Sequence, residues 1–170
     1  VEAAGTLNLD GVSYVLLSDL TANVVGYSNI GVKDLVIPQY VYMADTAYEV
    51  TQISPYAFYL ESTLLSIALP ESIKSIGAEA FYECMRLEVV DFGNNPTLES
   101  IGYQAFAYCY ELRNIIIPAT VIELDWYVFY QCYKLETAIF AEGIQITSIP
   151  YGMFTYCENL REIVIPATVI

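Results

Sequence analysis

LESIGYQAFAYCYELRNIIIPATV, residues 98–121, joins a segment around Phe106 to an apolar run that stops at a Pro. Apolar residues recur at spacings of three around Phe106, which favours a short helix or 3₁₀ turn. In the run, Ile115 and Ile117 are two residues apart and therefore lie on the same face of a strand. Versions of this stretch fill the chain after about residue 50, so it is one unit of a repeat.

The repeat has five copies, which align on one Phe in each. These are Phe58, Phe81, Phe106, Phe129 and Phe154, at successive spacings of 23, 25, 23 and 25 residues. The strand pairs nine and eleven positions later are Ile67/Leu69, Val90/Phe92, Ile115/Ile117, Ala138/Phe140 and Ile163/Ile165. One unit is too small to bury its own apolar face, so neighbouring units must stack. We therefore predict an α/β solenoid, a leucine-rich repeat array with a short helix or 3₁₀ turn and a short parallel strand in each unit.

The shared pattern, I-x-x-I-x-x-x-A-F-x-x-C-x-x-L-x-x-I-x-I-P-x-x-V, resembles the BspA-like leucine-rich repeats of bacterial surface proteins. The sequence departs from this pattern at Glu61, where Cys is usual, and at Val128 and Met153, where Ala is usual. The resemblance implies the stacked repeat fold. It also implies an exported protein, extracellular or attached to the bacterial cell surface, that adheres to host or partner-cell proteins.

The chain divides into two parts near residue 50. Residues 1–49 lack the Phe repeat, and an Asp-Gly turn within residues 7–14 predicts a hairpin, so we expect a β-rich N-terminal cap. Residues 35–38 copy the strand ending of the repeat and predict a zeroth repeat strand. Residues 50–170 hold the five repeats, and we expect their C-terminal end to be uncapped. The sequence is then either part of a longer array, or its open end pairs with a second copy.

Composition excludes several functions. The formal net charge is −14, from 20 acidic and 6 basic residues, which argues against nucleic acid and anionic membrane surfaces as partners. No apolar run reaches the ~18 residues of a membrane span, so no membrane insertion is expected. The chain has no His, no phosphate-binding Gly loop and no metal-ligand spacing. We therefore expect no enzyme activity and no cofactor.

Four cysteines lie three positions after the repeat Phe: Cys84, Cys109, Cys132 and Cys157. In an exported protein such a set suggests disulfides. The repeat instead gives all four the same inward position beside a Leu, where Cys behaves as a small buried hydrophobe. We favour free, buried thiols.

Charged residues alternate in sign along two rows, five and seven positions after the Phe. The rows include Arg86, Glu111 and Lys134, and Glu88, Arg113, Glu136 and Arg161. Stacked units then place opposite charges side by side. We interpret the rows as cross-repeat pairs that favour the correct register, and not as a ligand clamp.

Two surfaces could bind a partner. Repeat arrays commonly bind through their strand-lined face, where the outward candidates are Ala68, Asp91, Asn114, Ile116, Ile139 and Val164. A second set of candidates lies three positions before the Phe in successive units: Tyr103, Trp126 and Tyr151. These aromatic side chains could stack on sugar rings or simply pack on one another.

The predicted function is a non-catalytic protein-binding or adhesion module at a bacterial cell surface, acting through the strand-lined face. Its partner would be an extracellular protein or a glycan. Two alternatives stay open: a structural spacer within a longer surface protein, and a carbohydrate-binding array of stacked aromatics.

Overall fold

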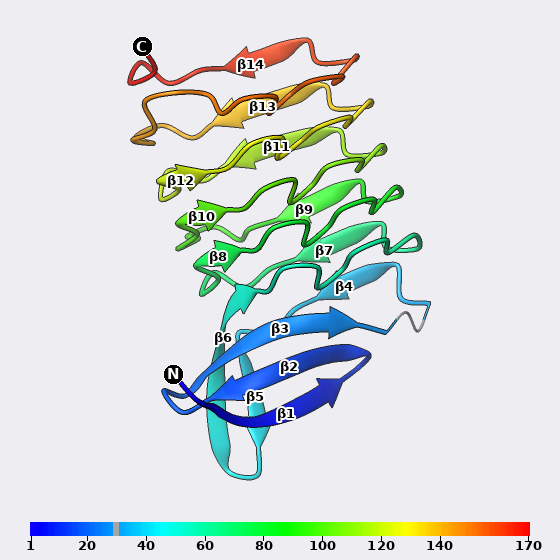
Figure 1. Ribbon diagram of the computed structural model, residues 1–170, viewed down its shortest axis with the longest axis vertical. Coiled ribbons are helices and arrows are strands. Elements are labelled where there is room, and N and C mark those ends of the chain that lie inside the picture. The colour runs from blue at the N-terminus through cyan, green and yellow to red at the C-terminus, as the bar shows by residue number, and fades with distance from the viewer. Residues whose placement is uncertain (29–30) are drawn as a thin grey trace.

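The computed structural model describes residues 1–28 and 31–170, which wind into a stack of coils with the two termini at opposite ends (Figure 1). The first strands form an antiparallel meander: β1 (Ala3–Leu9), β2 (Val12–Leu17) and β3 (Thr21–Tyr27). Asp10 and Gly11 join β1 to β2 with positive φ angles of 50° and 82°, as a tight hairpin turn requires. A second hairpin pairs β5 (Tyr40–Met43) with β6 (Thr46–Ile53).

Parallel ladders run along two sides of the stack. On one side, β6 continues the meander into short strands: β8 (Ser75–Ile76), β10 (Ser100–Ile101) and β12 (Glu123–Leu124). On the other side lie two three-stranded ladders. The first contains β4 (Asp34–Val36), β7 (Ser66–Ala68) and β9 (Val89–Asp91). The second contains β11 (Asn114–Ile117), β13 (Thr137–Phe140) and β14 (Glu162–Val164).

The predicted helix or 3₁₀ turn in each unit is wrong, because the described residues contain tight turns there and no helix. Ten residues, two before and two after each repeat Phe, have positive φ: Tyr56, Leu60, Glu79, Glu83, Gln104, Tyr108, Tyr127, Gln131, Gly152 and Tyr156. Each turn segment thus contains two left-handed residues four positions apart, which prevents a helix from propagating through it. The left-handed conformation also completes the turns: Gln104 has a φ of 50°, and the Ala105 N–H donates to the Gly102 carbonyl at 3.2 Å.

Hydrogen bonds to the next coil stabilise these turns. The Phe106 N–H donates across the stack to the Val128 carbonyl at 2.9 Å, whereas the next N–H, of Ala107, donates within its own turn to Gln104 at 3.1 Å. Alternation of this kind satisfies backbone groups in two directions and offsets the cost of left-handed residues that are not Gly.

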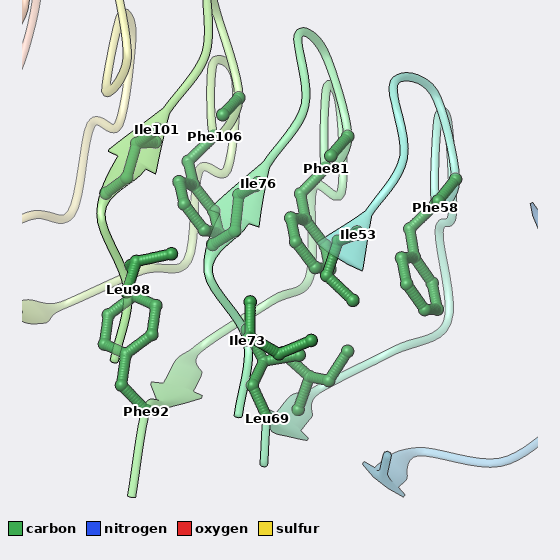
Figure 2. Packing of buried hydrophobic residues seen from close by; sticks show 14 of the residues in the cluster. Ile53, Phe58, Leu69, Ile73, Ile76, Phe81, Phe92, Leu98, Ile101 and Phe106 are labelled. Carbon is green, nitrogen blue, oxygen red and sulfur yellow. The ribbon is translucent and has the colours of Figure 1, made fainter. Parts of the chain in front are cut away.

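The core consists of columns with one residue from each coil (Figure 2). The repeat Phe rings stack nearly parallel, with centroids 5.0 Å apart for Phe58–Phe81 and for Phe81–Phe106. The next steps are 5.6 Å for Phe106–Phe129 and 5.8 Å for Phe129–Phe154. Most strand residues predicted to point inward are buried, for example Ile115 and Ile117, but Val90 is half-buried, and Ile163 and Ile165 are exposed in the last coil.

The four cysteines form a further column, and their predicted inward position is confirmed. Cys84, Cys109 and Cys132 are fully buried, and Cys157 is half-buried. Each Sγ donates to the backbone carbonyl of the repeat Phe in the previous unit, at 3.1–3.3 Å; Cys109, for example, donates to Phe81. Burial raises the pKa of all four thiols, that of Cys157 to about 12. Glu61 takes the Cys position in the first unit, where its carboxylate accepts hydrogen bonds from Thr63.

Gly102→Ala is expected to lower the free energy of unfolding by about 1–3 kcal/mol. A Cβ on Gly102 would lie 2.7 Å from the Ala78 nitrogen and 2.9 Å from the Gly77 carbonyl carbon, so two backbones of adjacent coils would have to separate. Urea denaturation measures the loss. Gly26→Ala is the matched control, because its Cβ would meet nothing closer than 4.0 Å. Equal effects of the two substitutions would contradict this account.

Candidate functional site

The strand-lined face presents an apolar strip in its C-terminal half. The ladder pairs Ile116 with Ile139, and Ile139 with Val164, so these outward side chains lie side by side on β11, β13 and β14. The side chain of Ile116 is 59% exposed, and Val164 is also exposed. A second row beside the strip is polar, where the Thr137 hydroxyl donates to Asn114 Oδ1 at 2.8 Å.

The predicted stripe does not run the whole length of this face. Ala68 and Asp91 belong to the other ladder, in which they are in register with Val36. Because β9 and β11 belong to different sheets, the row is interrupted between Asp91 and Ile116. Sequence reasoning did not select Val36, which is 71% exposed, although its alternation with buried Leu35 and Ile37 marks it as outward.

A cleft of about 490 Å³ lies where the two ladders part, referred to below as the interladder cleft. Asp91, Asn114 and Ile116 line it, together with loop residues that follow β9 and β11. Glu71, on the previous coil, anchors the loop after β9, since its Oε1 accepts hydrogen bonds from the N–H groups of Asn94 and Asn95, each at 2.9 Å. The lining of the interladder cleft is mostly apolar, with Phe92, Pro96, Pro118 and Ala119 among the contributors. The cleft therefore suits an inserted apolar side chain.

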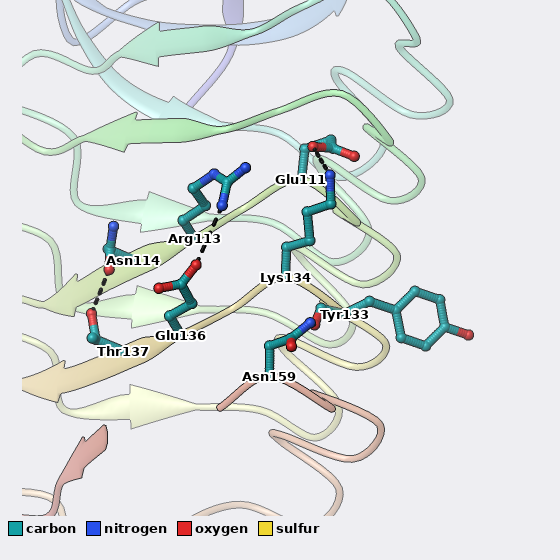
Figure 3. A network of polar contacts seen from close by, with 8 residues as sticks. All are labelled: Glu111, Arg113, Asn114, Tyr133, Lys134, Glu136, Thr137 and Asn159. Carbon is teal, nitrogen blue, oxygen red and sulfur yellow. Dashed lines mark hydrogen bonds and ion pairs between the residues drawn. The ribbon is translucent and has the colours of Figure 1, made fainter. Parts of the chain in front are cut away.

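The charged rows pair across the coils beside this face (Figure 3). Arg113 lies 3.3 Å from Glu136, and Lys134 lies 2.7 Å from Glu111. In the part of the chain that the structure describes, these are the two ion pairs within 4 Å, and both join the coils of β11 and β13. The predicted pairing along the rows is therefore confirmed at one step of each row and, among the described residues, does not extend to Arg86, Glu88 or Arg161. Both pairs link neighbouring coils, and none of their residues belongs to the apolar strip.

Arg113→Glu is expected to lower stability only slightly, by about 0.2–1 kcal/mol, because both partners are substantially exposed to solvent. Lys74→Glu serves as a matched control, since it changes the net charge equally and lies outside both rows. The melting temperature should fall further for Arg113→Glu than for the control. Identical values for the two variants would show that the Arg113–Glu136 pair adds nothing.

The predicted aromatic row is only partly formed. Trp126 and Tyr151 meet edge to face with centroids 6.3 Å apart, whereas Tyr103 contacts Tyr127, at 6.2 Å. Two other rows stack as parallel rings: Tyr59–Tyr82 at 5.2 Å and Tyr110–Tyr133 at 5.1 Å. The Tyr103, Trp126 and Tyr151 side chains therefore do not form one continuous column.

Residues 1–28 and 31–170 contain no cluster of three or more Cys, Asp or Glu side chains placed to hold a metal ion. Among them, too, no helix has the length and apolar character needed to cross a bilayer.

Stacked coils joined by parallel ladders of short strands, one of which forms a strand-lined outer face, define a leucine-rich-repeat solenoid. The chain belongs to the family described as the BspA type Leucine rich repeat region, which matches residues 51–170 in six copies. This is a repeat family of bacterial surface proteins, consistent with a binding or adhesion module. The comparison with curated proteins found no match.

Solved structures support the same assignment. A leucine rich cell surface protein from Faecalibacterium prausnitzii is 30% identical, with a TM-score of 0.83 over 99% of this chain and 44% of its own. A leucine-rich repeat protein from Bacteroides capillosus is 26% identical, with a TM-score of 0.66 over 86% of this chain and 96% of its own. The T. pallidum Leucine Rich Repeat protein, 22% identical with a TM-score of 0.67 over 94% and 81%, shares the fold. The chain thus spans less than half the length of the Faecalibacterium protein.

Proposed function

We propose that this chain is a non-catalytic protein-binding or adhesion module displayed at a bacterial cell surface, and that it binds through its strand-lined face. The observation that carries the proposal is the apolar strip beside the interladder cleft, in which Ile116 and Val164 are exposed and Ile139 between them is half-buried. Contiguous exposed apolar side chains beside a hollow favour a protein partner, because burying them on binding is favourable.

The location and the lack of catalysis are supported by the relatives. Leucine-rich repeat proteins are generally non-catalytic, and the 30% identical Faecalibacterium protein is described as a cell surface protein. A surface protein of this type would meet an extracellular protein as its partner.

The chemistry of the strand face indicates what such a partner segment offers. An apolar side chain fits the interladder cleft, whose lining includes Phe92 and Pro96. A neighbouring Lys or Arg would face the exposed Asp91 carboxylate on a chain of net charge −14. Opposite charge raises the association rate and helps to orient the partner.

Changing Ile116 and Ile139 to Asp together is expected to weaken partner binding roughly tenfold or more, because charge would replace the centre of the apolar strip. Surface plasmon resonance against purified extracellular matrix and bacterial surface proteins measures the effect. Ile122→Asp is the matched control, since Ile122 is 60% exposed and lies outside the strip. If every partner binds the double variant as tightly as the unmodified chain, the strand face is not the binding surface.

A further inference from the structure

A second hollow, of about 410 Å³, lies on the turn side of the coils and is referred to below as the tyrosine hollow. Six tyrosines line it: Tyr103, Tyr108, Tyr127, Tyr130, Tyr151 and Tyr156. The other lining residues are Gln104 and Thr155. These residues come from the turns of three successive coils, after β10, after β12 and before β14. None of the strand-face candidates contributes to it.

The tyrosine hollow is held in shape by its own backbone and rings. Tyr108, Tyr127 and Tyr156 have φ angles of 59–62°, the left-handed conformation that recurs in every turn. The Tyr127 ring meets the rings of Tyr130 and Tyr151 edge to face, with centroids 5.4 Å from each. Such contacts orient aromatic rings before any ligand arrives.

Gly152 makes room for the central ring. A Cβ at this position would lie 2.3 Å and 2.4 Å from two carbons of the Tyr127 ring. In the other four units the equivalent residue, two before the Phe, carries a side chain. The Tyr127 ring can therefore lie across the fifth coil only because position 152 is Gly.

The side chains that line the tyrosine hollow are all polar and uncharged. Among the described residues that form it there is no charged side chain, although the chain carries 20 acidic residues. Every lining side chain offers a hydroxyl or an amide, and six of the eight also offer an aromatic ring. A phenol is protonated at neutral pH and can donate a hydrogen bond there. Burial, and then a hydrogen bond with Tyr151, raise the pKa of Tyr127 further.

We propose that the tyrosine hollow is a binding site for a neutral oligosaccharide. Sugar rings combine C–H faces, which pack on aromatic rings, with hydroxyl groups that phenol and amide groups can bind by donating or accepting hydrogen bonds. An aliphatic ligand would leave those polar groups without partners. The volume lies within the ~300–1,000 Å³ range of small-ligand sites. This site is independent of the strand face proposed for protein partners.

Isothermal titration calorimetry tests the proposal with tetrasaccharides of glucose, galactose, mannose and N-acetylglucosamine, and with sulfated and uronic acid tetrasaccharides for comparison. At least one neutral tetrasaccharide should bind. Tyr151→Ala, and Gly152→Ala, which displaces the Tyr127 ring without removing a lining residue, should each weaken that binding roughly tenfold. Tyr59→Ala, in a stacked pair outside the hollow, should change it less than about twofold.

Three results would overturn the site. The first is that no neutral tetrasaccharide binds at about 10 mM, tenfold above a dissociation constant of about 1 mM. The second is that the anionic tetrasaccharides bind more tightly than the neutral ones, and the third is that Tyr59→Ala weakens binding as much as Tyr151→Ala does. Circular dichroism melting checks that each variant is folded. The double variant Ile116→Asp, Ile139→Asp should keep saccharide binding, so the outcome at the tyrosine hollow does not depend on the outcome at the strand face.

Discussion

Phe106→Ala is expected to lower the free energy of unfolding by about 3–5 kcal/mol, more than any other single substitution considered. Phe106 is fully buried, and its ring stacks on Phe81 at 5.0 Å and on Phe129 at 5.6 Å. Removing it exposes two ring faces to a cavity. The cavity cannot close easily, because backbone hydrogen bonds such as Phe106 N–H to Val128 hold the coils at a fixed spacing.

Phe154→Ala is the matched control for this prediction. Phe154 has the same place in the last unit, but it is only half-buried, and within the Phe column it stacks on Phe129 alone, at 5.8 Å. Its loss should be roughly half that of Phe106, since less buried surface disappears. Urea denaturation of both variants gives the comparison. Equal losses would mean that the column does not act through stacking between coils.

The columns of the core could be predicted from the sequence because each coil contributes one residue to each column. A period fixed by Phe58, Phe81 and Phe106 fixes every other residue of the unit, so the buried Cys and Leu positions follow. The turn conformation could not be predicted in this way. A spacing of three suits both 3₁₀ helix and tight turns, and the sign of φ at Gln104 or Tyr108 leaves no mark on apolar periodicity.

The candidate sites were predictable only in part, for a similar reason. Outward strand positions such as Ile116 follow from alternation. The interladder cleft beside Ile116 depends on the loop after β9, which is anchored by Glu71, a residue more than 20 positions earlier in the chain. Likewise, equal spacing put Tyr103 beside Trp126, but the ring of Tyr103 contacts Tyr127 instead. Two-residue strands such as β10 are also too short to show a period of two.

The thiol column predicts a steep loss of stability in alkaline solution. Burial raises the pKa of Cys84, Cys109 and Cys132 in the folded chain above the ordinary value of 9.0. Below pH 9 these thiols are protonated in both states, and their contribution to stability is fully present. As the pH rises above 9, the unfolded chain loses thiol protons while the folded chain keeps them, so unfolding becomes more favourable. Each such thiol lowers the free energy of unfolding by ~1.4 kcal/mol per pH unit, and the three together by ~4 kcal/mol.

Combining Cys109→Ala with Cys132→Ala isolates this effect from the titration of the tyrosines, which both proteins share. The double variant should be less stable near pH 8, because two small cavities open in the column. Its free energy of unfolding should nevertheless fall less steeply above pH 9, by ~2.7 kcal/mol per pH unit relative to the unmodified chain. Urea denaturation under reducing conditions, from about pH 8 to about pH 10.5, measures both slopes. Parallel slopes would show that the folded chain ionises these thiols as readily as the unfolded chain, and that the column is open to solvent.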